Sequence, residues 1–136
     1  PLDGAFAQAW RNRGITETKP CLSVIEGIGR SKIEPGFMFD VVDKVIEVTD
    51  NASCSAAWFL EQQLGRRYGG SSGTNFIACL QLAEHMRERN ETGSIVTLLC
   101  DRGERYVETL FNPSWLAQHG IMLESEAIQK LSNHLI

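Results

Sequence analysis

The hydrophobic and polar positions of this chain follow two periods in turn, one typical of helices and one typical of strands. Helical spacing predicts helices over residues 3–13, 52–64, 73–89 and 124–135, with a shorter one starting near Asn112. Residues 41–48 and 94–99 have the alternating or continuously apolar pattern of strands. A nearly continuous apolar run implies a strand covered on both faces, as in a parallel sheet. The order of elements therefore predicts an α/β fold, a three-layer sandwich with a mostly parallel sheet.

Local signals mark the ends of the predicted elements and the positions that should pack. Thr49 and Asp50 are natural caps for the helix over 52–64, and Gly65 should end it. Residues 26–40 hold two glycines, a proline and another glycine, and should be largely irregular. The candidate packing positions are Phe6, Ala9, Trp10, Val45, Ile46, Val48, Ala56, Ala57, Phe59, Leu60, Ile77, Leu80, Leu82 and Ala83.

Composition narrows the possible partners. The chain has 136 residues, 43% of them hydrophobic, which is enough for one compact domain with a core. Its net charge is −4 and no basic stripe is present, so neither nucleic acid nor an anionic membrane is an expected partner. No apolar run reaches the roughly 20 residues of a membrane helix, and the first residues lack a signal-peptide pattern. These features favour the cytoplasm.

The cysteines agree with a reducing compartment. Cys21, Cys54, Cys79 and Cys100 lie far apart, without a C-x-x-C pair or a histidine at metal-ligand spacing. Cys54 and Cys79 stand among apolar helix positions, where a cysteine usually serves as a small buried hydrophobic residue. We therefore predict neither a structural disulfide nor a metal site.

The segment from Gly69 to Asn75, with the sequence GGSSGTN, is the strongest candidate for a binding site. Glycine lets the backbone approach a flat or phosphorylated ligand closely. The start of the following helix offers N–H groups that suit an anion or a polar ring substituent. The alternative is an ordinary turn between a strand and a helix, with serines as N-caps.

Three further motifs accompany this segment in a fixed order. Glu26-Gly27-Ile28-Gly29 lies upstream, a valine-rich stretch ending in Val48-Thr49-Asp50 follows it, and Asp101-Arg102-Gly103-Glu104-Arg105-Tyr106 lies downstream. The order and spacing of these motifs resemble those of the cysteine synthase / cystathionine β-synthase family. Its members are fold-type II enzymes that use pyridoxal phosphate. The resemblance covers about residues 24–115. It implies that residues 1–136 are the carboxyl-terminal portion of such an enzyme, with 116–136 as a terminal helical extension.

The resemblance also implies a site and its partners. The residues expected to border the cofactor are Gly69, Gly70, Ser71, Ser72, Asp101 and Arg102. Those expected at the substrate entrance, as a mobile wall, are Glu26, Gly27, Ile28 and Gly29. The partners implied are the amino-terminal half of the same enzyme, a small amino-acid substrate and a second copy in a homodimer.

Two features depart from the family pattern. Family members commonly have a serine facing the pyridine nitrogen, whereas this chain has Asp101-Arg102 at that turn. If Asp101 faces the pyridine nitrogen, it would favour the protonated ring, whereas Arg102 in that place would suppress the protonation. If Arg102 instead points outward, a backbone group or a water molecule would face the nitrogen. The Schiff-base lysine motif is also missing, because the lysines at 19, 32, 44 and 130 stand in other contexts. We expect no catalytic residue in this chain, and its start without Met suggests a processed or partly recorded product.

The favoured hypothesis is part of a pyridoxal-phosphate enzyme of cysteine metabolism that replaces or eliminates a β-substituent. Whether the enzyme is a cysteine synthase or a cysteine desulfhydrase stays open at this point. An alternative from another class is a non-catalytic α/β interaction module derived from such an enzyme. A nucleotide-binding half of Rossmann type is disfavoured, because the chain has no G-x-G-x-x-G after a first strand.

Overall fold

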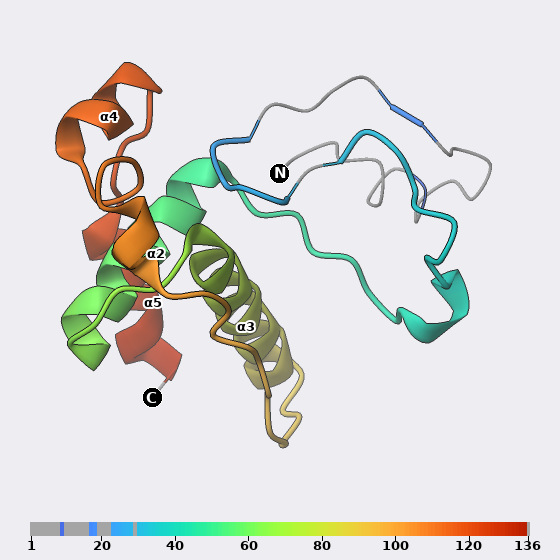
Figure 1. The fold of residues 1–136 in the computed structure, drawn as a ribbon. Helices are drawn as coiled ribbons and strands as arrows, with labels where there is room; N and C mark the ends of the chain where they lie inside the picture. The colour runs from blue at the N-terminus through green and yellow to red at the C-terminus, as the bar shows by residue number, and fades with distance from the viewer. Residues whose placement is uncertain (1–8, 10–16, 19–22, 29, 136) are drawn as a thin grey trace.

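A computed structural model describes residues 9, 17–18, 23–28 and 30–135, and these residues are mainly helical. The α-helices are α2 (Asp50–Leu64), α3 (Gly70–Glu88), α4 (Pro113–Gln118) and α5 (Ser125–Leu135), and the 3₁₀ turns are η1 (Phe39–Val41) and η2 (Gly103–Tyr106). Helices α2, α3 and α5 pack together, while the chain over 30–43 extends away from them and returns to the core at Ile46 and Val48 before it enters α2 (Figure 1). The helix predicted over 3–13 lies, apart from Ala9, outside the described residues.

Helix α2 begins two residues earlier than predicted, directly after the predicted cap Thr49, and it ends at Leu64 as predicted. The Thr49 hydroxyl accepts a hydrogen bond from the Ala52 N–H at 3.2 Å, which caps the first turn. Gly65 ends the helix in the left-handed conformation, with φ of 69°. The predicted packing positions of α2 are all buried, which confirms the predicted helix face.

Helix α2 lies between two hydrophobic clusters and therefore joins the halves of the core. The first cluster contains Ile25, Cys54, Ala57, Leu110, Phe111 and Leu116. The second contains Val48, Ala56, Phe59, Ile77 and Ile128. Since Ala56 and Ala57 are neighbours on one helix, the same helix turn packs into both clusters.

Helix α3 begins three residues earlier than predicted, at Gly70 rather than at residue 73. Gly69 is its N-cap in an extended conformation, and the Ser72 N–H donates to the Gly69 carbonyl at 3.0 Å. The glycine- and serine-rich segment is therefore the first turn of the helix rather than a loop before it. Low helix propensity suggested a loop, but packing against α2 offsets that preference.

The close approach of α3 to α2 depends on Gly73. A Cβ atom on Gly73 would overlap the Ser53 carbonyl oxygen and stand 2.9 Å from the Ala57 nitrogen. The neighbouring Thr74 hydroxyl donates to the Ser53 hydroxyl at 2.8 Å, so the contact is polar as well as close. The first turn of α3 is thus held directly against the backbone of α2.

The two predicted strands are wrong for the described residues, which contain isolated bridges but no strand ladder. The 41–48 stretch starts in η1 and continues as extended chain, with Val48 buried. The apolar run over 94–99 is extended and exposed, with 91% of Val96 and 74% of Leu98 accessible. A strand needs neighbouring strands for its backbone hydrogen bonds, and no described segment supplies them.

The described part of the chain shows neither a membrane span nor a metal cluster. None of its helices combines the length and apolar character required to cross a bilayer. No group of three or more His, Cys, Asp or Glu side chains within it is arranged to hold a metal ion. Burial, and secondarily the charge of Asp50, raises the pKa of the Cys54 thiol to about 12, so this thiol stays protonated and acts as a packing group.

Replacing Gly73 with alanine should destabilise the protein by about 1–3 kcal/mol, because the added methyl must push α3 away from α2. Urea unfolding of the intact protein measures this loss. Gly36→Ala is the matched control, since a Cβ there meets nothing within 4 Å. Equal stability of the two variants would show that the helices do not pack this closely.

Candidate functional site

The turn over residues 100–103 is tied to the chain that leads into α3. Three hydrogen bonds join them: Gly69 N–H to the Asp101 carbonyl (3.0 Å), Gly103 N–H to the Arg67 carbonyl (3.1 Å) and Cys100 N–H to the Ser72 hydroxyl (2.8 Å). Tyr68 and Arg102 form an isolated antiparallel bridge at the same place. The structure thus brings Asp101 next to Gly69 and Ser72, although it lies about 30 residues after them in sequence.

The Asp101 side chain fills the space in front of Gly69. A Cβ atom on Gly69 would overlap Asp101 Oδ1 and stand 3.0 Å from both Asp101 Cγ and Tyr106 Cε2. The other carboxylate oxygen of Asp101 accepts a hydrogen bond from the Tyr106 hydroxyl. A larger residue at position 69 would therefore have to displace the Asp101 carboxylate or the Tyr106 ring, a constraint that the sequence did not reveal.

The bond to Asp101 determines how Tyr106 titrates. Hydrogen bonding to the Asp101 carboxylate, together with burial and the charges of Asp101 and Glu26, raises the pKa of the Tyr106 phenol to about 12. Tyr106 is consequently a neutral hydrogen-bond donor throughout the physiological pH range. Arg102, next to Asp101 in sequence, is exposed and is the N-cap residue of η2.

The segment before Glu26 is anchored to the start of α2. The Asp50 carboxylate accepts hydrogen bonds from the Ser23 hydroxyl at 2.8 Å and from the Val24 N–H at 2.7 Å. Ile25 is buried against α3, with its Cδ1 atom 2.7 Å from the position of a Cβ on Gly70. This contact places Glu26 beside the first turn of α3.

The predicted entrance residues are only partly described. Gly27 has a positive φ of 77°, and Ile28 packs on the first hydrophobic cluster. Gly29 lies outside the described residues.

These contacts enclose a small pocket at the N-terminus of α3. Its volume is about 50 Å³, and its lining includes Glu26, Gly70, Ser71, Tyr106 and Trp115. Helix α3 has no side-chain cap at this end, whereas the Thr49 and Asn112 side chains cap α2 and α4. Because ligand pockets usually measure about 300–1,000 Å³, this pocket is too small to enclose a ligand by itself, and we call its lining residues the wall at the N-terminus of α3.

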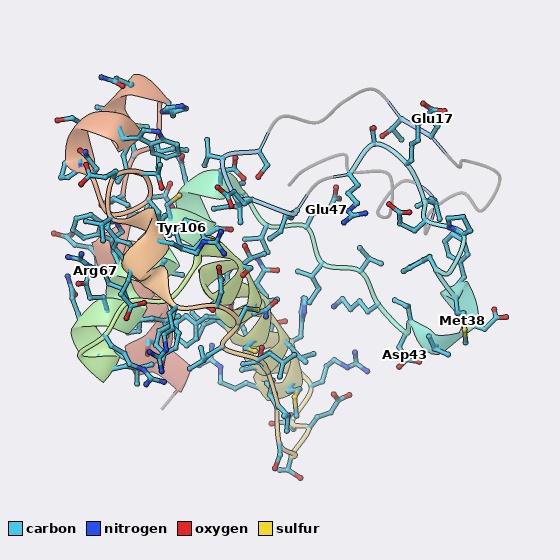
Figure 2. All side chains as sticks on the ribbon, viewed as in Figure 1. Glu17, Met38, Asp43, Glu47, Arg67 and Tyr106 are labelled. Carbon is cyan, nitrogen blue, oxygen red and sulfur yellow. The ribbon has the colours of Figure 1, made fainter. Side chains whose placement is uncertain are left out.

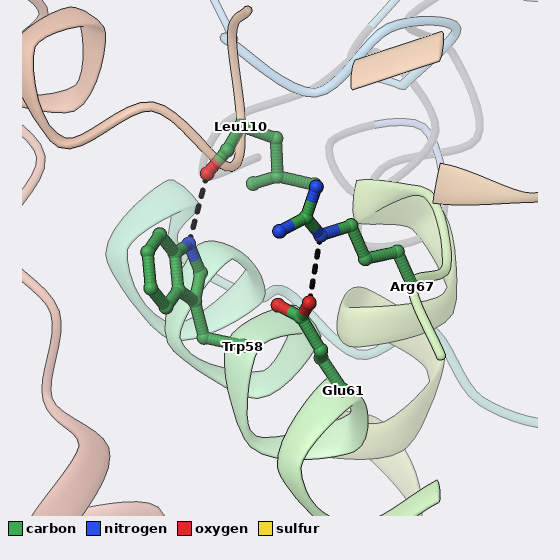
Figure 3. A network of polar contacts seen from close by, with 4 residues as sticks. All are labelled: Trp58, Glu61, Arg67 and Leu110. Atoms are coloured by element: carbon green, nitrogen blue, oxygen red, sulfur yellow. Dashed lines mark hydrogen bonds and ion pairs between the residues drawn. The ribbon is translucent and has the colours of Figure 1, made fainter. Parts of the chain in front are cut away.

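Helix α2 fixes the segments on both sides of this wall. The Trp58 indole N–H donates to the Leu110 carbonyl at 2.9 Å, and Arg67 Nε donates to Glu61 Oε1 at 2.7 Å (Figure 3). Arg67 and Tyr106 accordingly lie near the helical part of the molecule, far from Met38 and Asp43 in the extended region (Figure 2). Arg67 and Leu110 are therefore both bonded to the same helix.

The described lysines lie away from the pocket. Lys32 forms an ion pair with Glu17 at 3.4 Å, and Lys44 Nζ lies 3.4 Å from His85 Nδ1. Lys130 is exposed on α5. Lys19 lies outside the described residues.

Sequence reasoning missed Tyr106, Thr109 and Trp115 as pocket residues. Tyr106 stands in the motif Gly103-Glu104-Arg105-Tyr106, which was used only to establish the resemblance. The available signal for Tyr106 was its position five residues after Asp101. The hydrogen bond between the two side chains spans the η2 turn, which the sequence analysis did not predict. Nothing local in the sequence marks Thr109 or Trp115.

Known enzymes are similar to this chain in sequence. The chain is 40% identical over 121 residues to an L-cysteine desulfhydrase of Mycobacterium tuberculosis, a match that covers 89% of the chain and 33% of that protein. It is 34% identical over 94 residues to an N-(2-amino-2-carboxyethyl)-L-glutamate synthase of Cupriavidus metallidurans, covering 69% of the chain and 28% of the relative. A cysteine synthase of Dictyostelium discoideum is 30% identical over 113 residues, a match that covers 83% of the chain and 29% of that protein. No family model matches the chain.

The chain belongs to the cysteine synthase / cystathionine β-synthase family. It spans about a third of the length of the curated relatives that it matches. These relatives are pyridoxal-phosphate-dependent enzymes.

Removing the Asp50 carboxylate should release the segment that precedes Glu26. In Asp50→Ala the Val24 amide should exchange with solvent about tenfold faster or more, because its charged acceptor is lost. Hydrogen exchange of the intact protein, read by mass spectrometry on a peptide that begins before residue 22 and includes Val24, measures this change. Asp43→Ala, at an exposed aspartate, is the control. Unchanged exchange in Asp50→Ala would mean that another contact holds the segment.

Tyr106 should ionise near pH 12 rather than near 10. Since the folded-state pKa lies above the unfolded value, the associated stability is fully present below about pH 10 and is lost as the pH rises toward 12. The ultraviolet difference between the wild type and Tyr106→Phe during an alkaline titration isolates this phenol. A midpoint near 10 in the folded protein would exclude the bond to Asp101.

Proposed function

We propose that the intact protein uses pyridoxal phosphate to eliminate or replace the β-substituent of a cysteine or serine derivative. The observation that carries this proposal is the 40% identity, over 89% of the chain, to a protein named as an L-cysteine desulfhydrase. Identity to the cysteine synthase is lower, at 30%. The proposal therefore favours elimination from L-cysteine over synthesis of cysteine.

The wall at the N-terminus of α3 fits one side of the cofactor. The helix end lacks a side-chain cap, so its first N–H groups suit a negatively charged oxygen of the ring or of the substrate. Gly70 and Ser71 line the pocket there, and Asp101 lies beside Gly69. When bound, the cofactor would supply an electron sink for breaking the bonds at the substrate's α and β carbons.

Each predicted site residue has a role in this proposal. The residues that would border the ring are Gly69, Gly70, Ser71, Ser72, Asp101 and Arg102. The substrate entrance would be bordered by Glu26, Gly27, Ile28 and Gly29. The contact of Ile25 with Gly70 supports this position, because it places the segment beside the start of α3. Arg102 is exposed, which supports an outward arginine and leaves Asp101 as the ionisable group at the turn.

Further segments of the intact protein would complete the fold and the site. The exposed apolar run over 94–99 would become a strand of a mostly parallel sheet, beside strands from an amino-terminal part. That part would also supply the Schiff-base lysine, and residues 1–136 would be the carboxyl-terminal portion. A cytoplasmic homodimer is proposed from the family resemblance alone.

The purified intact protein tests this proposal. It should absorb visible light, and borohydride should remove the visible band by reducing the cofactor linkage to lysine. With L-cysteine it should release sulfide and pyruvate faster than it forms cysteine from an O-acylated serine and sulfide. The reverse order of rates would indicate a synthase. A protein without the visible band, even after added pyridoxal phosphate, would contradict the proposal and favour a non-catalytic interaction module.

Residues 1–136 expressed alone should aggregate or bind a complementary amino-terminal segment, because Val96 and Leu98 expose apolar surface. They should also show no visible cofactor band after addition of pyridoxal phosphate. Light scattering and absorbance measure the two outcomes. A monodisperse monomer with a borohydride-sensitive band would show that one of the four lysines of this chain binds the cofactor.

A further inference from the structure

A second pocket lies between α2, α3 and α5, the three helices that pack together in Figure 1. Its volume is about 150 Å³, and the described residues that line it are Ala52, Ile77, Leu80, Gln81, Glu84, Glu124, Ala127 and Ile128. None of these residues belongs to the wall at the N-terminus of α3. This α2/α3/α5 pocket is therefore separate from the candidate cofactor site.

The pocket exists because small side chains stand where the three helices meet. The Glu124 N–H donates to the Ser55 hydroxyl at 2.7 Å, and this bond fixes the start of α5 against α2. Ser55 is completely buried, so the bond is shielded from water. Ala52 on α2 and Ala127 on α5 have a single side-chain carbon each, and they leave the space between the helices unfilled.

The inner surface of the pocket is apolar. Ile77 and Ile128 belong to the second hydrophobic cluster, with 6% and 3% of their surfaces accessible, and Leu80 packs against the same cluster. An apolar cavity of about 150 Å³ is large enough to hold a benzene molecule. The pocket is smaller than the usual pocket for a drug-sized ligand, but it has room for one small ring or a branched alkyl group.

The charged groups among the described lining residues have the same sign. They are the carboxylates of Glu84 on α3 and of Glu124, directly before α5. Glu84 lies 3.8 Å from Arg87, but both side chains are more than a third exposed, so this ion pair is weak and competes little with a ligand. The Gln81 amide adds a neutral acceptor. An apolar cation therefore complements both the inner surface and the charged groups, whereas an anion is repelled.

We propose that the α2/α3/α5 pocket binds a small apolar ammonium ion. Its hydrocarbon part contacts Ile77, Leu80 and Ile128, and its charge faces Glu84 and Glu124. Burial of the hydrocarbon supplies the affinity, and the two carboxylates select the charge. This binding site goes beyond the proposed function and does not rest on it, because none of the pocket's residues has a role in that proposal.

A calorimetric titration of the intact protein with N-methylpiperidinium tests the inference. This cation has one saturated ring, and as a tertiary amine it forms no imine with pyridoxal phosphate. It should bind at one site with a dissociation constant of about 1 mM. Cyclohexanol, a neutral ring of similar size, should bind about tenfold more weakly because it lacks the charge.

Glu84→Gln and Glu124→Gln separate the effect of charge from the effect of shape. Each should weaken the binding of the cation about threefold and leave the binding of cyclohexanol unchanged. In the double variant the two probes should bind equally. Glu126→Gln is the matched control, because Glu126 is an exposed glutamate of α5 outside the pocket, and it should leave both affinities unchanged.

Ala127→Leu tests the pocket itself. Ala127 is exposed on α5 and leucine is a good helix former, so the fold should persist while the larger side chain fills the pocket. The affinity for both probes should fall at least about tenfold. Ala117→Leu, at an exposed alanine of α4 outside the pocket, should keep the wild-type affinities.

Four results would overturn the inference. Absence of saturable binding by the wild type would show that the pocket takes no such cation, and equal binding of the two probes would show that its carboxylates select no charge. An unchanged affinity in Ala127→Leu would place the bound cation elsewhere, and its displacement by L-cysteine would place it in the catalytic site. None of these measurements requires turnover or a bound cofactor, so a failure of the proposed function leaves the test intact.

Discussion

The candidate site depends on the hydrogen bonds that join residues 67–72 to residues 100–103. They connect segments that are distant in sequence, and they set the Asp101 turn directly beside the N-cap of α3. The 3₁₀ turn η2 starts at this junction and ends at Tyr106, whose side chain lines the pocket. If the junction opened, Asp101 and Tyr106 would both lose their places beside Gly69.

Helix α2 packs against the segments that form this junction. Its backbone contacts the first turn of α3 at Gly73. Its Glu61 and Trp58 side chains form hydrogen bonds with Arg67 and with the Leu110 carbonyl. Its first residue, Asp50, also binds the chain before Glu26. One rigid helix therefore determines the relative positions of three segments of the pocket, which is the preorganisation that a cofactor site requires.

The sequence predicted well those features that have a local cause. The ends of α2 follow from the cap at Thr49 and the glycine at 65, and α4 begins after Asn112 as the Asn-Pro signal predicts. The start of α3 was placed too late, because glycine and serine disfavour helix while the contact with α2 favours it. The run over 94–99 has strand composition, but composition cannot supply the neighbouring strands that pair with it. Tyr106 was missed because its importance comes from a tertiary hydrogen bond.

The most direct test of the account is a crystal structure of the intact protein with bound pyridoxal phosphate. The account predicts that the cofactor ring contacts Gly70 or Ser71 at the start of α3, with Tyr106 still bonded to Asp101. It also predicts that the backbone bonds between residues 67–72 and 100–103 persist. A cofactor bound away from the N-terminus of α3, or an Asp101 turn separated from Gly69, would contradict it.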